Sequence, residues 1–323
     1  MAVNEKDFVE RRQADWQKLH ALIDMGEHNI SRLSGRDLRD FGRLYRRAAR
    51  DLAVVRTHSG NPGLRAYLND LIGRGHGVLY KRPGKPLLQA LTGAALEAAR
   101  VVRRRWPFVM AAVSIGVVGA IFARNAVSME PSTLDVIVPG GLKGSLEQWK
   151  TQEFGPVDTE QALAMTGFYI YNNTLVAVRI VAGSVTLGAL TVNDLLENGA
   201  VMGAFWHELS GTPRLSRFLV SVYPHGVPEI SGIFIASAAG LLVGYTFLNP
   251  GRRTRVQAFR LVARDVAHLL GLGVVLIWIA APIEASFSFN AAVSDPGRIL
   301  VGTTLLFLLL AYITLAGRTN APR

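Results

Sequence analysis

The sequence predicts an all-α protein, a polytopic helical membrane bundle of about six spans with an N-terminal cytoplasmic helical domain. Two observations support this class. Half of the 323 residues are hydrophobic and only 18% are charged, whereas soluble domains average about 25% charged residues. The charge is also segregated, because residues 1–105 hold 21 of the 35 Lys and Arg residues and 11 of the 24 Asp and Glu residues. This separation is typical of a membrane protein with a soluble appendage.

The net charge of +11 and the pI of 10.3 do not indicate a nucleic-acid partner. Basic residues beside membrane spans follow the positive-inside rule, and no zinc-finger, RRM or helix-turn-helix pattern is present. The absence of cysteine excludes disulfides and thiolate chemistry. The first 25 residues lack the apolar core of a signal peptide, so we expect the N-terminus to stay in the cytoplasm.

Residues 1–85 are predicted to form a cytoplasmic domain of three amphipathic helices around a small core. The first covers residues 5–24. The second follows Ser34, whose spacing to Asp37 is that of a capping box with an acidic third residue. The third begins at the Asn61-Pro62-Gly63 turn, and we expect it to end at Gly73, Gly75 and Gly77.

Residues 86–105 are predicted to form an interfacial amphipathic helix that leads into the bilayer. Its C-terminal end is rich in arginine, and a second arginine cluster lies between the predicted spans at 230–248 and 268–283. We expect both clusters to bind lipid headgroups, which makes the lipid bilayer the first partner of the chain. The residues concerned are Arg100, Arg103, Arg104, Arg105, Arg252, Arg253 and Arg255.

Residues 106–317 are predicted to be the transmembrane domain, with a polar outer segment at 124–163 and a cytoplasmic tail at 318–323. Apolar length and the arginine distribution place both termini inside. The predicted spans cover residues 106–123, 174–192, 199–222, 230–248, 268–283 and 299–315. The third of these contains charged residues and a proline, so we expect it to be broken or re-entrant.

Polar residues within membrane spans are costly and mark functional or packing positions. His225 and Glu229 are four residues apart and therefore share a helix face, and the topology puts Glu284 at a similar depth. We expect a buried polar cluster, which is a packing network, a ligand path, or a metal or acid/base site. Its candidate members are Asn172, Asn173, Arg179, Asn198, His207, Glu208, His225, Glu229 and Glu284.

Motifs for catalysis are not evident. His207-Glu208 lacks the second histidine of a zinc-protease motif, and serine-hydrolase and nucleotide-binding patterns are missing. The sequence therefore indicates no enzyme, and we assign no cofactor and no metal. Small residues indicate close helix packing within the chain, with a homo-oligomer as the alternative. These glycines are Gly199, Gly203, Gly226, Gly240 and Gly244.

Several motifs resemble the stage II sporulation protein M family. They are Asn172-Asn173, Asn198-Gly199 with Gly203, Pro224-His225-Gly226 with Glu229, and the late Glu284. The segments Leu44-Tyr45-Arg46 and Tyr67-Leu68-Asn69 resemble the long members of that family. The family motif positions carried here are Asn172, Asn173, Asn198, Gly199, His225, Gly226, Glu229 and Glu284.

The resemblance implies a bacterial inner-membrane protein without an established enzymatic activity. It also implies partners among membrane or cytoplasmic proteins, including an AAA+ ATPase of the MoxR type. We therefore expect a membrane scaffold in cell-envelope remodelling or assembly that recruits partners through residues 1–105. The alternative is a transporter or channel-like component with a polar path at His225, Glu229 and Glu284. A metal-dependent intramembrane hydrolase is the third possibility.

Overall fold

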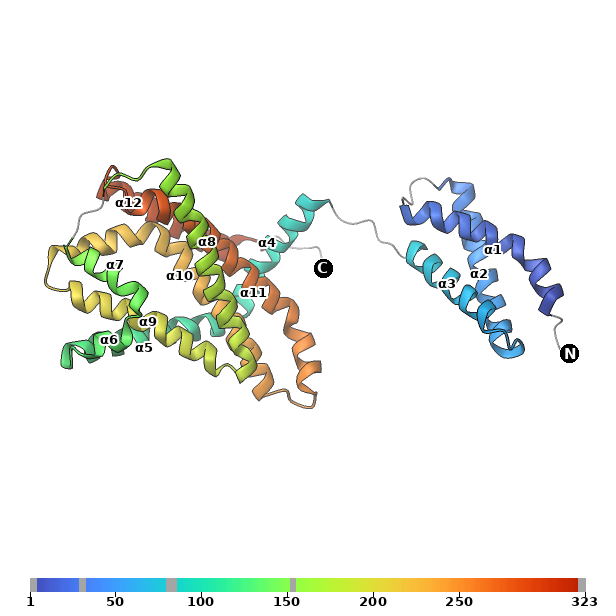
Figure 1. Cartoon of the computed structure of the whole chain (residues 1–323), viewed down its shortest axis with the longest axis horizontal. Coiled ribbons are helices and arrows are strands. Elements are labelled where there is room, and N and C mark those ends of the chain that lie inside the picture. The colour runs from blue at the N-terminus through green and yellow to red at the C-terminus, as the bar shows by residue number, and fades with distance from the viewer. Residues whose placement is uncertain (1–4, 29–32, 80–85, 152–154, 319–323) are drawn as a thin grey trace. The chain divides into compact units, whose positions relative to one another are not determined.

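The computed structural model describes residues 5–28, 33–79, 86–151 and 155–318, and within these ranges the chain is built from helices without strands. The chain divides into two compact units, Met1–Pro86 and Leu87–Arg323 (Figure 1). The prediction of an all-α protein is confirmed.

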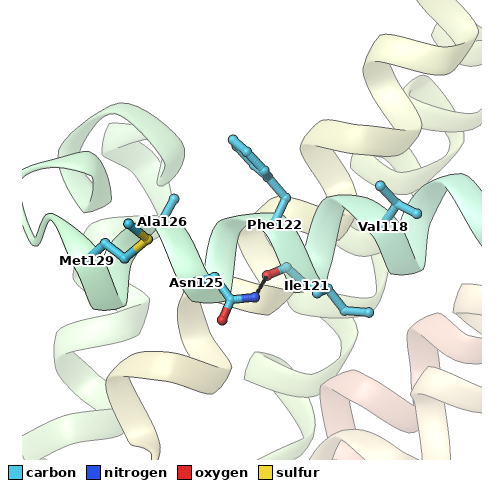
Figure 2. Close-up of a pocket in the computed structure, with 6 residues that line it drawn as sticks. All are labelled: Val118, Ile121, Phe122, Asn125, Ala126 and Met129. Atoms are coloured by element: carbon cyan, nitrogen blue, oxygen red, sulfur yellow. Dashed lines mark hydrogen bonds between the residues drawn. The ribbon is translucent and has the colours of Figure 1, made fainter.

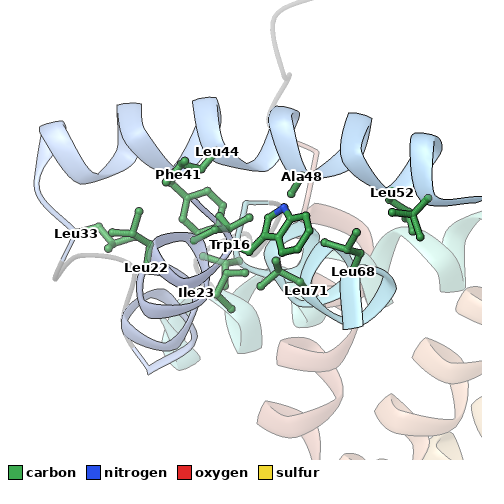
Figure 3. Packing of buried hydrophobic residues seen from close by; sticks show 13 residues of the cluster. Trp16, Leu22, Ile23, Leu33, Phe41, Leu44, Ala48, Leu52, Leu68 and Leu71 are labelled. Carbon is green, nitrogen blue, oxygen red and sulfur yellow. The ribbon is translucent and has the colours of Figure 1, made fainter. Parts of the chain in front are cut away.

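The first unit, Met1–Pro86, contains α1 (Glu5–His28), α2 (Gly35–His58) and α3 (Pro62–Leu79). The predicted capping box is present, because the Ser34 side chain accepts a hydrogen bond from the backbone N–H of Asp37 and the Asp37 carboxylate accepts one from the N–H of Ser34. Trp16 of α1 is 3% exposed and lies in a core that all three helices share. Figure 3 shows the side chains of this core meeting between the helices.

The predicted end of α3 is wrong. The helix continues through Gly73, Gly75 and Gly77 to Leu79. Gly75 is buried, and a Cβ atom at this position would lie 3.0 Å from the ring of Tyr45 and 3.4 Å from Ile23. The glycine therefore allows α3 to approach α1 and α2 closely instead of ending the helix, because tertiary packing outweighs its weak helix propensity.

The second unit, Leu87–Arg323, contains nine α-helices within its described residues, together with a short 3₁₀ helix after α8 and a π-helical turn after α11. The α-helices are α4 (Leu87–Arg104), α5 (Trp106–Met129), α6 (Thr133–Ile137), α7 (Gly140–Thr151), α8 (Thr159–Ala182), α9 (Ala189–Leu209), α10 (Pro213–Leu248), α11 (Arg255–Ile283) and α12 (Asp295–Leu315). The 3₁₀ helix is Gly183–Thr186 and the π-helical turn is Glu284–Ser288.

Among the residues that the structure describes, four helical segments are long and apolar enough to cross a bilayer. They are Trp106–Met129, Pro213–Leu248, Arg255–Ser288 and Asp295–Leu315. A helix rises about 1.5 Å per residue, so even the shortest of them, with 21 residues, can cross about 30 Å of hydrocarbon. The chain therefore has the helices of a multi-pass membrane protein.

Both middle intervals are divided, which was expected for 199–222 but not for 174–192. The interval 174–192 is divided by the 3₁₀ helix and by a turn at Gly188, whose φ is +89°. The interval 199–222 is divided at Gly211, whose φ is +76°, and by Thr212 and Pro213, which begin α10. Left-handed glycines end helices and proline favours the first helical turn, so α8 and α9 form a hairpin and α10 is one continuous helix of 36 residues.

Small residues set the closest helix contacts in this unit. Cβ atoms added to Gly199 or Gly203 of α9 would lie 2.0 Å from carbonyl oxygens of α5. Gly240 faces Thr191, and Gly244 faces Gly188 in the turn between α8 and α9. These four glycines pack within the chain. The added Cβ of Gly226, in contrast, would meet only side chains of its own helix.

The arginines of α4, and Arg105 directly after it, bind protein groups within the unit. Arg100 donates to the carbonyl of Gly317 (2.9 Å), and Arg103 donates to the carbonyls of Ala316 (2.8 Å) and Ile313 at the end of α12. Such contacts satisfy carbonyls that a helix leaves free at its C-terminus. Arg104 and Arg105 both pair with Asp265 of α11, at 2.6 and 2.8 Å.

Of the second arginine cluster, Arg252 and Arg253 are exposed in the turn between α10 and α11. Arg255, at the start of α11, is also exposed and donates a hydrogen bond to the carbonyl of Phe247.

Candidate functional site

A cluster of three titratable side chains lies between α10 and the end of α11. His225 and Glu229 come from α10, and Glu284 begins the π-helical turn after α11. One ligand atom from each residue lies within 4.8 Å of the other two. His225 is 5% exposed, and both glutamates are half-buried. We call these three residues the polar cluster.

Local geometry explains why the chain brings these groups together. His225 and Glu229 are four residues apart on one helix and therefore lie on the same face. Pro224 and Pro228 lie inside α10 beside them, and a proline inside a helix removes one backbone hydrogen bond and bends the helix. The π-helical turn re-aims the end of α11, and such turns are frequent at functional sites.

Neighbouring side chains hold the polar cluster in place. The Nδ1 atom of His225 is 2.7 Å from the hydroxyl of Ser288. The amide of Asn173 on α8 donates to Oε1 of Glu229 at 2.7 Å. The hydroxyl of Tyr169, also on α8, lies within hydrogen-bonding reach of Glu284. Three helical segments thus contribute to one site.

One atom of the polar cluster lacks a partner. The Oε2 atom of Glu284 is buried from solvent and makes no hydrogen bond within the described part of the chain. Buried carboxylate oxygens are almost always paired, because leaving one unpaired costs the full desolvation penalty. Glu229 brings a second carboxylate to the same place, and two close carboxylates repel each other unless a cation or a shared proton lies between them.

A separate hollow lies on α5, away from these groups. Figure 2 shows that it is lined only by residues of that helix, which are Val118, Ile121, Phe122, Asn125, Ala126 and Met129. The one polar side chain, Asn125, donates to the carbonyl of Ile121 in its own helix. This apolar surface has no titratable group, so it does not compete with the polar cluster as a candidate site.

The model of a known family, described as stage II sporulation protein M, matches residues 107–289, which include all three members of the polar cluster. The chain belongs to the stage II sporulation protein M family. A second family model, a domain of unknown function (DUF8413), matches residues 6–81. The family suggested by the sequence motifs is therefore confirmed.

One curated relative of this family member is an uncharacterized protein of Methanocaldococcus jannaschii. It is 31% identical over 116 residues, which are 35% of this chain and 65% of the relative. The chain thus spans slightly less than two thirds of the length of that relative. No solved structure matches the chain.

In this member of the stage II sporulation protein M family, several other residues that the sequence suggested for the site lie outside the polar cluster. Asn172 is exposed and donates a hydrogen bond to its neighbour Asn173. Arg179 pairs with Asp194 at 2.9 Å. Asn198 donates to the backbone carbonyl of Asp194 in its own helix.

His207 and Glu208 of the same chain also lie apart from the polar cluster. Both are near the end of α9, where Glu208 forms an ion pair with Lys150 of α7. This pair connects the polar segment around α7 to the hairpin of α8 and α9. Its chemistry is that of a packing contact between helices.

The sequence did not predict two residues of the site. They are Tyr169 and Ser288. Both have the same signal in the sequence, since Tyr169 precedes Asn173 by four residues and Ser288 follows Glu284 by four. The spacing that links His225 to Glu229 thus recurs on each of the three segments that build the site.

Proposed function

We propose that this protein is a multi-pass scaffold of the bacterial inner membrane that takes part in cell-envelope remodelling or assembly. In this proposal the unit Met1–Pro86 recruits partner proteins. One observation carries the proposal. The N-terminal unit has a hydrophobic core of its own, is a separate compact body, and matches a family description separate from that of the membrane unit. An appended domain of this kind is a common means of bringing a second protein to a membrane.

Ion pairs between helices support a stable shape for the recruiting unit. Arg47 of α2 pairs with Asp15 of α1 at 2.7 Å, and Lys18 of α1 pairs with Asp40 of α2 at 2.6 Å. Arg74 of α3 reaches two carboxylates of α1. Lys18 and Arg43 hold the pKa of the Asp40 carboxyl at about 2, well below its usual value. These contacts keep the unit folded before a partner binds. Binding then loses less conformational entropy than it would if the unit had to fold on the partner.

The surface of this unit suits an acidic partner surface. Residues 1–86 contain 17 Lys and Arg residues against 10 Asp and Glu residues, and complementary charge speeds association. Large apolar side chains are also partly exposed there, including Leu38 and Tyr67. An AAA+ ATPase is the partner that the family resemblance implies, and we include it in the proposal.

We further propose six crossings with both termini in the cytoplasm. The four apolar helices supply four crossings, and the hairpin of α8 and α9 supplies two. The arginines of α4 and of the turn between α10 and α11 support this orientation, because cytoplasmic loops carry an excess of Lys and Arg. The transport alternative requires a water path that reaches the polar cluster, where Glu284 Oε2 is buried from solvent.

The test is a comparison of copurified proteins. The full chain and a chain lacking residues 1–86, both tagged at the C-terminus, are extracted from membranes in mild detergent and analysed by quantitative mass spectrometry. We expect the shortened chain to reach the membrane in similar amount but to lose at least ten-fold of the specific partners. Equal recovery of the same partners by both chains would contradict recruitment by this unit.

Two point variants of the full-length chain complement the deletion, one that unfolds the unit and one that serves as its control. Trp16 is buried in the core of the unit, and Trp16→Ala costs about 3–5 kcal/mol because it removes a large buried aromatic. This full-length variant should lose the same partners as the shortened chain. Met25→Ala changes an exposed apolar residue of the same helix (44% exposed), and we expect it to keep the unit folded and to report only a direct contact at that position.

A further inference from the structure

We propose that His225, Glu229 and Glu284 bind one divalent first-row transition-metal ion. Zn²⁺ is the probe that we choose for this site. The sequence analysis assigns no metal but keeps a metal site among the readings of this cluster, and the structure adds the distances between the ligand atoms. It goes beyond the scaffold function and does not depend on residues 1–86.

The spacing of the ligand atoms fits a single ion. The three atoms lie within 4.8 Å of one another. Two atoms that coordinate the same zinc ion lie at most about 4.2 Å apart, since each is about 2.1 Å from it. The 4.8 Å separation exceeds this limit by at most about 0.6 Å, so binding of one ion requires the side chains to move together by that amount.

The ligand types indicate a transition metal. Mg²⁺ and Ca²⁺ prefer six or more oxygen ligands. Imidazole nitrogen suits Zn²⁺ and its first-row neighbours, and carboxylate oxygen is also a common zinc ligand. One histidine and two glutamates give three protein ligands, which leaves a coordination position for water or for another donor.

The surrounding hydrogen bonds are those of a metal site. The Nδ1 atom of His225 is 2.7 Å from the Ser288 hydroxyl. When Nδ1 donates to this hydroxyl, Nε2 of the ring carries the free lone pair that a metal requires. Asn173 holds Oε1 of Glu229 and leaves the second oxygen of that carboxylate available. Glu284 Oε2 has no other partner among the described residues.

Charge balance gives the physical reason for an ion. Two ionised carboxylates side by side within a helical membrane body repel each other and are costly to bury. A divalent cation neutralises both at once and supplies the missing partner for Glu284 Oε2. A proton shared between the carboxylates is the competing arrangement, and it binds no metal.

The experiment measures metal binding directly. The full-length protein is purified in mild detergent with a tag that contains no histidine, stripped with a chelator, and titrated with Zn²⁺. We expect one Zn²⁺ per chain in the wild type. Affinity should fall at least ten-fold in Glu284→Gln, which removes a charge while keeping the side-chain shape. Ser288→Ala should weaken binding by about 10–100-fold, because it removes a hydrogen bond that orients the histidine.

Glu208→Gln is the matched control. This glutamate lies on α9 and pairs with Lys150, outside the polar cluster. The control should bind Zn²⁺ as the wild type does. A stripped wild-type protein that binds no Zn²⁺ would overturn the proposal and favour the shared proton, as would a Glu284→Gln variant with unchanged affinity. Recruitment of partners by residues 1–86 is measured separately, so either proposal can fail without the other.

Discussion

At the scale of single residues, Asp51 organises the core of the N-terminal unit. It is 3% exposed. One carboxylate oxygen accepts a hydrogen bond from the indole N–H of Trp16 at 3.0 Å, and the other pairs with Arg12 at 3.3 Å. A buried carboxylate is retained only where such partners satisfy it. The residue therefore fixes the position of α1 against α2 by directional contacts.

Asp51→Ala should destabilise this unit by about 1–3 kcal/mol, because it leaves the buried Trp16 N–H without an acceptor. The measurement is urea unfolding of residues 1–86 expressed alone, followed by tryptophan fluorescence. Asp70→Ala changes an exposed carboxylate on α3 of the same unit, and we expect a change within about 0.5 kcal/mol. Equal effects of the two substitutions would contradict the role assigned to Asp51.

The residues of the candidate site could be predicted only in part. The four-residue spacing of His225 and Glu229 is enough, by itself, to imply that they share a helix face. The place of Glu284 beside them required an assumed topology. Asn198 lies in the same family motif set, but its amide is used by its own helix. Sequence spacing within one helix does not reveal which face of that helix meets another helix.

At the scale of elements, the contact between α5 and α9 depends on two glycines. A Cβ atom on Gly203 would lie 2.0 Å from the carbonyl oxygen of Ala120, and one on Gly199 would lie equally close to the carbonyl oxygen of Gly116. The neighbouring atoms are backbone and cannot rotate away. The two helices therefore have to move apart to accommodate any side chain.

Gly203→Ala should lower the stability of the membrane unit by about 1–3 kcal/mol, which is the usual cost of overpacking. The thermal unfolding midpoint of the full chain in detergent measures this loss. Gly271→Ala is the matched control, because a Cβ atom there meets nothing within 4 Å and alanine favours the helix. A midpoint that falls as much in the control as in Gly203→Ala would show that the α5–α9 contact is not limiting.

Element boundaries were harder to predict than element types. The long apolar runs correctly indicate α5, α11 and α12, although α11 begins at Arg255, thirteen residues before the predicted span. The predicted break within 199–222 is present, whereas the break within 174–192 was not predicted, because hydropathy averages over short turns. The Thr212-Pro213 pair, which begins α10 with a capping hydroxyl and a proline, is the local signal that marks the true boundary.

At the scale of the whole molecule, the proposed topology can be tested because the chain contains no cysteine. Single cysteines are introduced and exposed to a membrane-impermeant maleimide in intact cells. We expect Gly144→Cys on α7 to react at once. Gly63→Cys and Arg253→Cys should react only after permeabilisation, since both are predicted to be cytoplasmic. Reaction of Gly144→Cys and Arg253→Cys from the same side would contradict the topology.

One position decides how the hairpin of α8 and α9 lies in the bilayer. Val185 is in the turn between these helices and is 74% exposed. Two full crossings place this turn at the cytoplasmic face. In that case Val185→Cys should react with a water-soluble reagent once the cells are permeabilised. A hairpin that only re-enters the membrane leaves the position in lipid, where the reagent does not reach.

The hydrogen bonds from α4 to the end of α12 affect the order in which this unit assembles in the cell. Arg103 and its acceptor at Ala316 are 213 residues apart in sequence. At a translation rate of about 5–20 residues per second, roughly 10–40 s separate their emergence from the ribosome. During that interval the guanidinium groups of Arg100 and Arg103 lack the carbonyl acceptors that they have in the folded chain. The contacts between α4 and the end of α12 can therefore form only after the last helix has been made, which makes them a late step in the assembly of this unit.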